Sequence, residues 1–202
     1  MTAATATTRK RQVTRADLLP MPQYAAERGA RRAALLAVKQ DRRIEVGPFA
    51  MFHFESFETM WHQIHEMLLI EKGGEAQIDD ELAAYNPLIP QGHELVATVM
   101  FEVTDAEQRA AVLARLGGVE NTAFLRLAGL ILRGRPEQDQ ERSTAQGKAS
   151  AVQFIHFPFT KAQIAAFRHP GAEVIIGFDH PRYGHMAVMT EAMRQLLAAD
   201  FD

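Results

Sequence analysis

The sequence of 202 residues contains no cysteine, and this absence removes several kinds of chemistry. Without a thiol, the protein has no disulfide, no thiolate nucleophile, no Cys-ligated zinc site and no protein-ligated iron–sulfur cluster. A divalent metal, as a candidate cofactor, must therefore be held by histidine, aspartate or glutamate side chains.

Long apolar runs are also missing from the sequence. No stretch approaches the roughly 20 consecutive apolar residues that a membrane-spanning helix needs, so we expect no membrane contact. The N-terminal residues 1–11 lack the apolar centre of a secretory signal. Together with the absence of cysteine, these features predict a cytoplasmic protein.

The formal net charge is only −3, but the charges are unevenly distributed. Residues 1–45 carry ten Lys or Arg against four Asp or Glu, whereas the rest of the chain carries 12 against 21. A basic segment can contact nucleic acid or an acidic protein. Nucleic-acid binding through Arg9–Arg11 and Arg28–Arg32 is therefore an alternative. It is disfavoured, because no aromatic residue lies among Arg9, Lys10 and Arg11 to stack on bases. We expect residues 1–13 to form a disordered basic tail.

Helix and strand patterns are mixed over residues 14–202 without a strict βαβ rhythm. This favours a single α+β domain with a mainly antiparallel mixed sheet and packed helices. The predicted strands are 43–47, 49–54, 95–103, 124–127, 130–132, 151–157, 173–179 and 186–189. The predicted helices are 23–39, 57–72, 78–85, 105–116 and 161–167, with a last helix after Thr190. The polar residues 134–148 predict a mobile loop.

The helix predicted over residues 57–72 is nearly apolar and carries polar side chains that need partners. At about 100° per residue, Glu71 falls near the centre of its apolar face, and Glu66 lies on a flank with Gln63. An unpaired buried charge is costly, so each carboxylate needs an arginine, a metal or a ligand. His62 precedes Glu66 by four residues and can share a proton, a metal or a ligand with it. The alternative is an exposed His62–Glu66 pair of small energetic value.

Three more residues complete a hypothetical metal site with Glu66. Glu102 ends one predicted strand, His156 lies within another, and His180 follows a third. Such a site needs three or four convergent ligands, and Asp179 could orient an imidazole among them. The alternatives are a solvated Glu102, a hydrogen-bonded core histidine at 156, and a turn in which Asp179 and His180 bond to the backbone.

Several short segments resemble a known bacterial family, the domain-of-unknown-function 3501 (DUF3501) proteins. These segments are Thr14-Arg15-Ala16-Asp17-Leu18-Leu19, Arg43-Ile44-Glu45-Val46-Gly47-Pro48, Phe54-Glu55, Gln63-Ile64-His65-Glu66-Met67-Leu68, Tyr85-Asn86-Pro87-Leu88-Ile89-Pro90, Ser150-Ala151-Val152-Gln153-Phe154 and Asp179-His180-Pro181. They run over nearly the whole chain after the tail, which makes the resemblance specific.

The resemblance shifts the candidate ligand-binding residues. The family pattern Gln-x-x-Glu-Met falls on Gln63, Glu66 and Met67, and it does not include His62 or His65. The resemblance therefore implies that these two histidines are incidental. It moves the ligand-binding role to a set of four residues, namely Gln63, Glu66, Glu71 and Asp179.

The resemblance implies a redox or oxidative-stress setting, because such proteins are often encoded beside rubrerythrin-like and iron–sulfur oxidoreductase proteins. Two functions stay open. The first is a metal- or small-cofactor-binding protein whose His/carboxylate site serves redox or hydrolytic chemistry. The second is a non-catalytic partner or adaptor that docks on such an oxidoreductase, for which the uneven charge and nine methionines are suited. A second copy of the chain is a further candidate partner.

Overall fold

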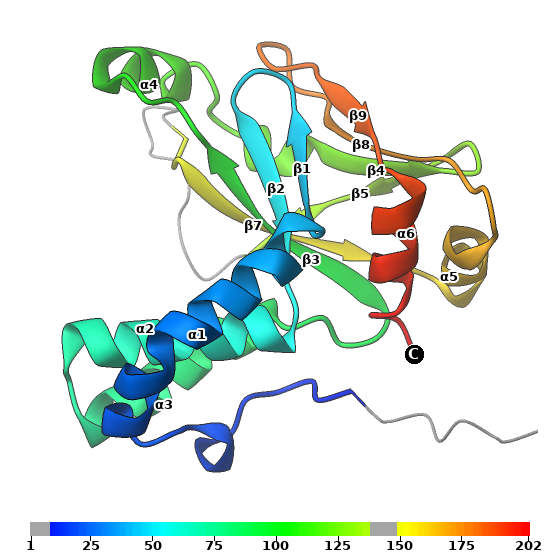
Figure 1. Ribbon diagram of the computed structural model, residues 1–202. Helices are drawn as coiled ribbons and strands as arrows, with labels where there is room; N and C mark the ends of the chain where they lie inside the picture. Colours follow the sequence, from blue (N-terminus) through cyan, green and yellow to red (C-terminus); the bar gives the residue numbers. More distant parts are fainter. Residues whose placement is uncertain (1–8, 138–148) are drawn as a thin grey trace, which may run out of the picture.

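The computed structural model describes residues 9–137 and 149–202 and shows a mixed α+β fold (Figure 1). The predicted fold class is confirmed. Every strand pair in the described structure is antiparallel, but the strands divide into two sheets. Most of the predicted loop, residues 138–148, lies outside the described residues. No helix among the described residues is long and apolar enough to cross a membrane.

Sheet A has five strands in the spatial order β1, β2, β3, β7, β6. These strands are β1 (Arg43–Val46), β2 (Ala50–Phe54), β3 (Glu94–Phe101), β7 (Val152–Pro158) and β6 (Arg135–Pro136). Alternate residues of a strand point to opposite faces. In β3, Leu95 and Val99 join one buried cluster, and Val96 joins another. Sheet A therefore has an apolar patch on each face, and both patches are covered.

Sheet B has four strands in the order β5, β4, β8, β9. These strands are β4 (Ala123–Leu127), β5 (Leu130–Arg133), β8 (Val174–Phe178) and β9 (Met186–Val188). The predicted hairpin across Ala128-Gly129 is confirmed. Both turn residues have positive φ, 49° and 77°, which matches the right-handed twist of a two-residue hairpin.

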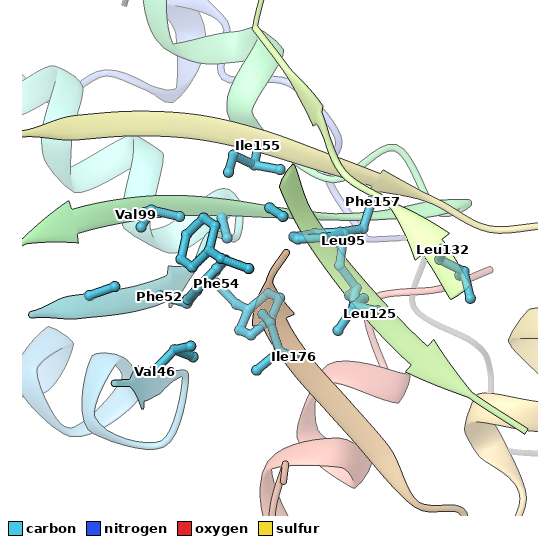
Figure 2. Packing of buried hydrophobic residues seen from close by; sticks show 14 of the residues in the cluster. Val46, Phe52, Phe54, Leu95, Val99, Leu125, Leu132, Ile155, Phe157 and Ile176 are labelled. Atoms are coloured by element: carbon cyan, nitrogen blue, oxygen red, sulfur yellow. The ribbon is translucent and has the colours of Figure 1, made fainter. Parts of the chain in front are cut away.

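The main core lies between the two sheets (Figure 2). Phe52, Leu95 and Phe157 from sheet A meet Leu125 and Ile176 from sheet B. All five side chains are fully buried. This face-to-face packing holds the two sheets together through the hydrophobic effect.

Short helices close the ends of this core. They are α4 (Ala106–Leu113), α5 (Lys161–Arg168) and α6 (Glu191–Ala198), with the 3₁₀ turn η3 (Val119–Thr122). Two further 3₁₀ turns, η1 (Arg15–Asp17) and η2 (Asn86–Leu88), lie beside the second apolar cluster, which is described below. Asp105, Thr160 and Thr190 each accept a hydrogen bond from a backbone N–H of the first turn of their helix. The predicted starts of these helices are confirmed, since such N-caps satisfy otherwise unpaired donors.

Three helices cover the other face of sheet A as an arm (Figure 1). They are α1 (Met21–Gln40), α2 (Phe57–Glu71) and α3 (Glu75–Tyr85). The second apolar cluster joins Ile64 and Leu68 of α2 to Val96 of β3. Ser56 caps the start of α2, and its hydroxyl accepts from the Thr59 N–H at 3.4 Å. Helix α2 therefore packs against sheet A on one side and contacts α1 on another.

An N-terminal strap, residues 9–19, crosses the arm before α1 begins. Val13 is fully buried, and its backbone makes two hydrogen bonds with the Asn86 side chain, of 2.7 and 2.9 Å. Arg11 donates to two backbone carbonyls, each at 2.9 Å. The predicted disorder is therefore wrong for residues 9–13, because distant parts of the chain bind them. The rest of the predicted tail, residues 1–8, lies outside the described residues.

Candidate functional site

Helix α1 meets α2 through polar side chains and turns its alanine-rich side outward. Tyr24 is its only buried residue. Eight residues on the other side are all exposed, and we call them the α1 outward face: Pro22, Ala25, Ala26, Gly29, Ala30, Ala33, Leu36 and Ala37. An amphipathic surface helix ordinarily buries its apolar face. Helix α1 instead exposes its apolar face and turns its polar side toward α2, because Tyr24 and Arg28 form hydrogen bonds with Glu66 of α2.

Glu66 is held by an arginine. Arg28 donates to Glu66 through Nε, at 2.9 and 3.2 Å, and through Nη2, at 2.7 Å. The Tyr24 hydroxyl donates to the same carboxylate at 2.8 Å. The hydrogen bonds from Arg28, with a smaller contribution from Tyr24, lower the pKa of Glu66 to about 2, although burial opposes them. The carboxylate is therefore ionised at neutral pH and forms an ion pair with Arg28.

Tyr24 links Glu66 to His62. The Tyr24 oxygen lies 3.0 Å from His62 Nδ1. The single hydroxyl proton goes to the Glu66 carboxylate, so His62 Nδ1 carries a proton and donates to the tyrosine oxygen. Burial raises the pKa of Tyr24 and lowers the pKa of His62. Neither group is poised as a charged catalyst near neutral pH, and the cluster joins α1 to α2.

His65 fastens the N-terminal strap to α2. Its Nε2 accepts from the Leu19 N–H at 3.0 Å, so its Nδ1 carries the proton and donates to the Trp61 carbonyl at 2.7 Å. The ring is fully buried, and burial lowers its pKa. Trp61 Nε1 donates to the Asp17 carbonyl at 2.8 Å. His65 therefore has a structural role that the sequence did not predict, because it connects the strap to α2.

An open groove of about 290 Å³ lies between α1 and α2, beside this cluster. It is lined by Arg31, Ala34, Leu35, Val38, Phe57, Glu58, Trp61 and His62. The Arg31 guanidinium lies 5.0 Å from the centre of the Trp61 ring, within the range of a cation–π contact. Val38 is 40% exposed in the groove. The groove can accept an apolar side chain beside a cation.

We predict that Glu66→Gln lowers the free energy of unfolding at pH 7 by about 1–2 kcal/mol, because a neutral amide weakens the bonds to Arg28. The pKa of Glu66 is depressed from its ordinary value of 4.5 to about 2. Its contribution is therefore complete above pH 4.5 and is lost as the pH falls towards 2. Urea unfolding at pH 7 and near pH 3 measures this loss.

The matched control for this prediction is Glu71→Gln on the same helix. Glu71 is exposed, and this change is expected to cost less than about 0.5 kcal/mol. An equal cost of Glu66→Gln at both pH values would contradict the role of the Arg28 ion pair.

The residues predicted to hold a metal are not brought together. Glu66 is bound by Arg28, as described above. His156 lies between two carboxylates, with Nδ1 3.1 Å from Glu94 and Nε2 3.1 Å from Glu137. Two acceptors require both ring nitrogens to be protonated. Desolvation lowers the pKa of His156, but the two glutamates outweigh it and raise the pKa overall. Both ring nitrogens therefore already have a carboxylate partner.

The other two predicted metal ligands are also elsewhere. Glu102 is exposed, and one of its oxygens lies 3.8 Å from His53 Nε2. His180 bonds to the backbone, with Nε2 3.3 Å from the Gly117 carbonyl and Nδ1 accepting from the Arg182 N–H at 3.2 Å. The alternative interpretation of His180 as a turn residue is thus confirmed. Over residues 9–137 and 149–202, no group of three His, Asp or Glu side chains could hold a metal ion.

The predicted ligand-binding residues have separate partners as well. Gln63 donates to the Tyr85 hydroxyl at 3.5 Å. Glu71 does not lie in the core, because α2 ends at this residue; it is exposed and accepts from Gln77 at 2.8 Å. Asp179 directly follows β8 of sheet B, and Arg133 donates to it at 3.0 Å. Of this set, only Glu66 lies in the cluster beside the groove.

Sequence reasoning missed Tyr24 and Gly29, and it did not predict Arg28 as the partner of Glu66. Tyr24 and Arg28 are four residues apart, which places them on one side of the predicted helix 23–39. The opposite side of that helix has no charged residue. The sequence therefore shows that one side of this helix lacks charge and has a glycine at its centre. It does not show which side of the helix faces solvent.

Comparisons with known proteins give a family and a fold. The model of a family described as protein of unknown function (DUF3501) matches residues 12–201. A crystal structure of a novel protein of unknown function from Burkholderia pseudomallei K96243 is similar, with a TM-score of 0.87 and 38% sequence identity. The match covers 95% of this chain and 100% of that chain. No curated protein matches this chain.

Proposed function

Because the chain belongs to the DUF3501 family of proteins of unknown function, as its motifs predicted, and inherits no reaction from it, we propose a function from its surface. The protein is a non-catalytic adaptor that binds a helix of a partner protein along α1. The partner helix has small or apolar residues at its centre and acidic residues at its edge.

The α1 outward face carries this proposal. All eight residues of the face are exposed, none is charged, and Leu36 is 61% exposed. A solvent-facing helix surface normally carries charged residues. A contiguous exposed apolar surface with a polar rim is typical of a protein-binding site. The groove beside Trp61 adds an apolar pocket next to this face.

Gly29 is a second, independent indication of close helix approach. It lies in the middle of α1, with negative φ and no atom within 4 Å of the place where a Cβ would be. Nothing in the described part of the chain therefore requires glycine at this position, where it costs about 0.5–1 kcal/mol relative to alanine in a helix. Small residues allow helix backbones to come close to one another. A partner helix packed against Gly29 would account for this residue.

Charge complementarity defines the edge of the partner helix. Helix α1 carries four cationic residues and one acidic residue. Arg28 and Arg31 are paired with Glu66 and Glu27. In the described structure, Arg32 and Lys39 have no ion-pair partner. Two unpaired cations beside an apolar surface favour an acidic partner.

The resemblance makes a rubrerythrin-like protein or an iron–sulfur oxidoreductase the first partner to test. The other function, a metal or small-cofactor site, has less support. Its proposed ligands, Glu66, Glu102, His156 and His180, each have their own partners at separate places.

Binding of this protein to the purified rubrerythrin-like and iron–sulfur proteins of the same organism tests the proposal. We expect Gly29→Ala to raise the free energy of unfolding by about 0.5–1 kcal/mol and yet to weaken binding, because the new methyl group blocks the partner helix. Leu36→Glu should weaken binding about tenfold or more through loss of apolar contact and charge repulsion. Isothermal titration and thermal unfolding measure the two effects.

The matched control is Leu130→Glu, an exposed leucine on the β4–β5 hairpin with 57% exposure. It should leave binding unchanged. Absence of binding to both proteins would contradict the redox-partner assignment. Binding that Gly29→Ala and Leu36→Glu leave unchanged would contradict the use of α1.

A further inference from the structure

His65 is a buried histidine whose ring accepts a hydrogen bond from the backbone. The ring is fully buried, and its Nε2 accepts from the Leu19 N–H at 3.0 Å. Its Nδ1 lies 2.7 Å from the Trp61 carbonyl, which can only accept a hydrogen bond. Both ring nitrogens therefore have a fixed role, Nδ1 as donor and Nε2 as acceptor. Only the neutral ring fits this arrangement, because a proton on Nε2 would point at the Leu19 N–H.

The surroundings of His65 disfavour its protonated form. The centres of the Trp61 and Tyr24 rings lie 3.9 and 4.6 Å from the centre of the His65 ring and enclose it. Burial lowers the pKa of His65, and the hydrogen bond to the Trp61 carbonyl opposes this effect. The nearby charged or titratable groups Arg31 on α1 and His62 on α2 lower the pKa further. The ring is therefore neutral at neutral pH while the strap is attached.

A protonated His65 would have no counter-ion in this environment. Among the described residues, no carboxylate forms an ion pair with the ring. Five acids on the surrounding elements have cations of their own: Glu27 pairs with Arg31, Glu66 with Arg28, Asp17 with Lys10, and Glu75 and Asp79 with Arg15. A buried charge without a partner is costly, so a proton on His65 opposes burial of its ring.

The chain between the strap and α1 has room to move. We call residues 17–20 the junction. An open groove of about 450 Å³ borders it, and the half-buried Leu18 and Leu19 line one wall of this groove. The earlier part of the strap is fixed more firmly, because Val13 is fully buried and its backbone bonds twice to Asn86. The junction can therefore leave α2 without exposing the main core or the start of the strap.

We propose that protonation of His65 detaches the junction from α2 and thereby makes the position of α1 sensitive to pH. An imidazolium has two donors and no acceptor, so the Leu19 N–H loses its partner. The Pro20 carbonyl accepts from the Tyr24 N–H at 3.0 Å in the first turn of α1, so a displaced junction shifts this turn as well. The consequence for partner binding at α1 rests on the proposed function, whereas the detachment itself does not.

Detachment is expected on the acid side of neutrality. A detached ring in water has its ordinary pKa of 6.5, and the pKa of the attached ring is lower. The attachment is therefore complete above pH 6.5 and weakens as the pH falls below this value towards the pKa of the attached ring. One proton is taken up on detachment, so the equilibrium constant for detachment rises by up to about tenfold for each pH unit.

Amide hydrogen exchange of the full chain at about pH 7.5 and about pH 5, without any partner, tests the proposal. After correction for intrinsic exchange rates, we expect the protection of residues 17–24 to fall about tenfold at the lower pH. The amides of β3 and of Val13 should keep their protection. Trp61 is the only tryptophan and lies against the His65 ring, so its fluorescence should change over the same pH range.

His65→Gln is the matched variant, because its amide oxygen can accept from the Leu19 N–H and does not titrate. Residues 17–24 of this variant should be protected equally at both pH values. His62→Gln removes the neighbouring histidine and should keep the pH response. Circular dichroism establishes that each variant is folded.

The comparison within the parent chain is decisive by itself. Equal protection of residues 17–24 at the two pH values would overturn the proposal. Loss of protection in β3 to the same extent would also overturn it, because the whole chain would then unfold together. A pH response that His65→Gln retains would show that another group is responsible. Since no partner takes part in these measurements, their outcome is separate from that of the binding experiments on α1.

Discussion

Replacing Asp200 by alanine is expected to lower the free energy of unfolding by about 3–5 kcal/mol, because the change leaves the buried Arg42 guanidinium without its charge partner. Arg42 and Asp200 are 4% and 2% exposed. Arg42 donates to the Asp200 carboxylate and to the carbonyls of Phe54 and Glu55, at 2.9 and 2.8 Å. Arg42 thereby connects the C-terminal segment to the end of β2.

Urea unfolding of Asp200→Ala and of a surface control measures this effect. The control is Asp202→Ala, whose side chain is 77% exposed and pairs with Arg11 at the surface. It should cost less than about 1 kcal/mol. The double variant Arg42→Met with Asp200→Leu should cost less than the two single changes added together, since it leaves no buried charge without a partner; Arg9, which also contacts Asp200, is 48% exposed. A loss below about 1 kcal/mol for Asp200→Ala would contradict a buried ion pair.

Replacing Tyr183 by phenylalanine is expected to lower the free energy of unfolding by about 2–4 kcal/mol, because one hydroxyl serves three backbone groups. The hydroxyl accepts from the N–H groups of Phe49 and Ala50, at 2.9 and 2.8 Å, and donates to the Val46 carbonyl at 2.8 Å. Tyr183 is 3% exposed. Phenylalanine would leave these groups unpaired away from water, and the turn between β1 and β2 would lose its support.

The matched control is Tyr85→Phe. The Tyr85 hydroxyl accepts a single long hydrogen bond of 3.5 Å from Gln63 and is only partly buried. This change is expected to cost less than about 0.5 kcal/mol. Thermal and urea unfolding of both variants gives the comparison. Similar costs for the two tyrosines would mean that the three bonds at Tyr183 contribute little.

Most helices and strands could be predicted from local patterns. The helix predicted over residues 57–72 is observed at Phe57–Glu71, and the predicted hairpin is present at its expected turn. The helix predicted at 105–116 is shorter, because α4 ends at Leu113. Periodicity and capping residues act within a few residues of one another, so they remain visible in the sequence.

The candidate site was predicted less well. Glu66 was identified correctly as a carboxylate that needs a partner, but the partner, Arg28, lies 38 residues earlier on another helix. Glu71 was placed on the core face by its helical angle. It is exposed, because the helix extends past the apolar cluster at that point. An angle on a helical wheel gives the side of a helix and not how far the neighbouring layer extends.

The sequence by itself determined the chemistry that is absent, the α+β class, the family and most element boundaries. These follow from composition and from patterns of short range. Only the tertiary structure decided which side of α1 faces solvent, which acid each arginine meets, and that Ile131, Met186 and Val188 of sheet B are exposed. The Arg42–Asp200 pair joins residues separated by 158 positions. Such contacts depend on how the layers pack, and no local spacing in the sequence encodes that arrangement.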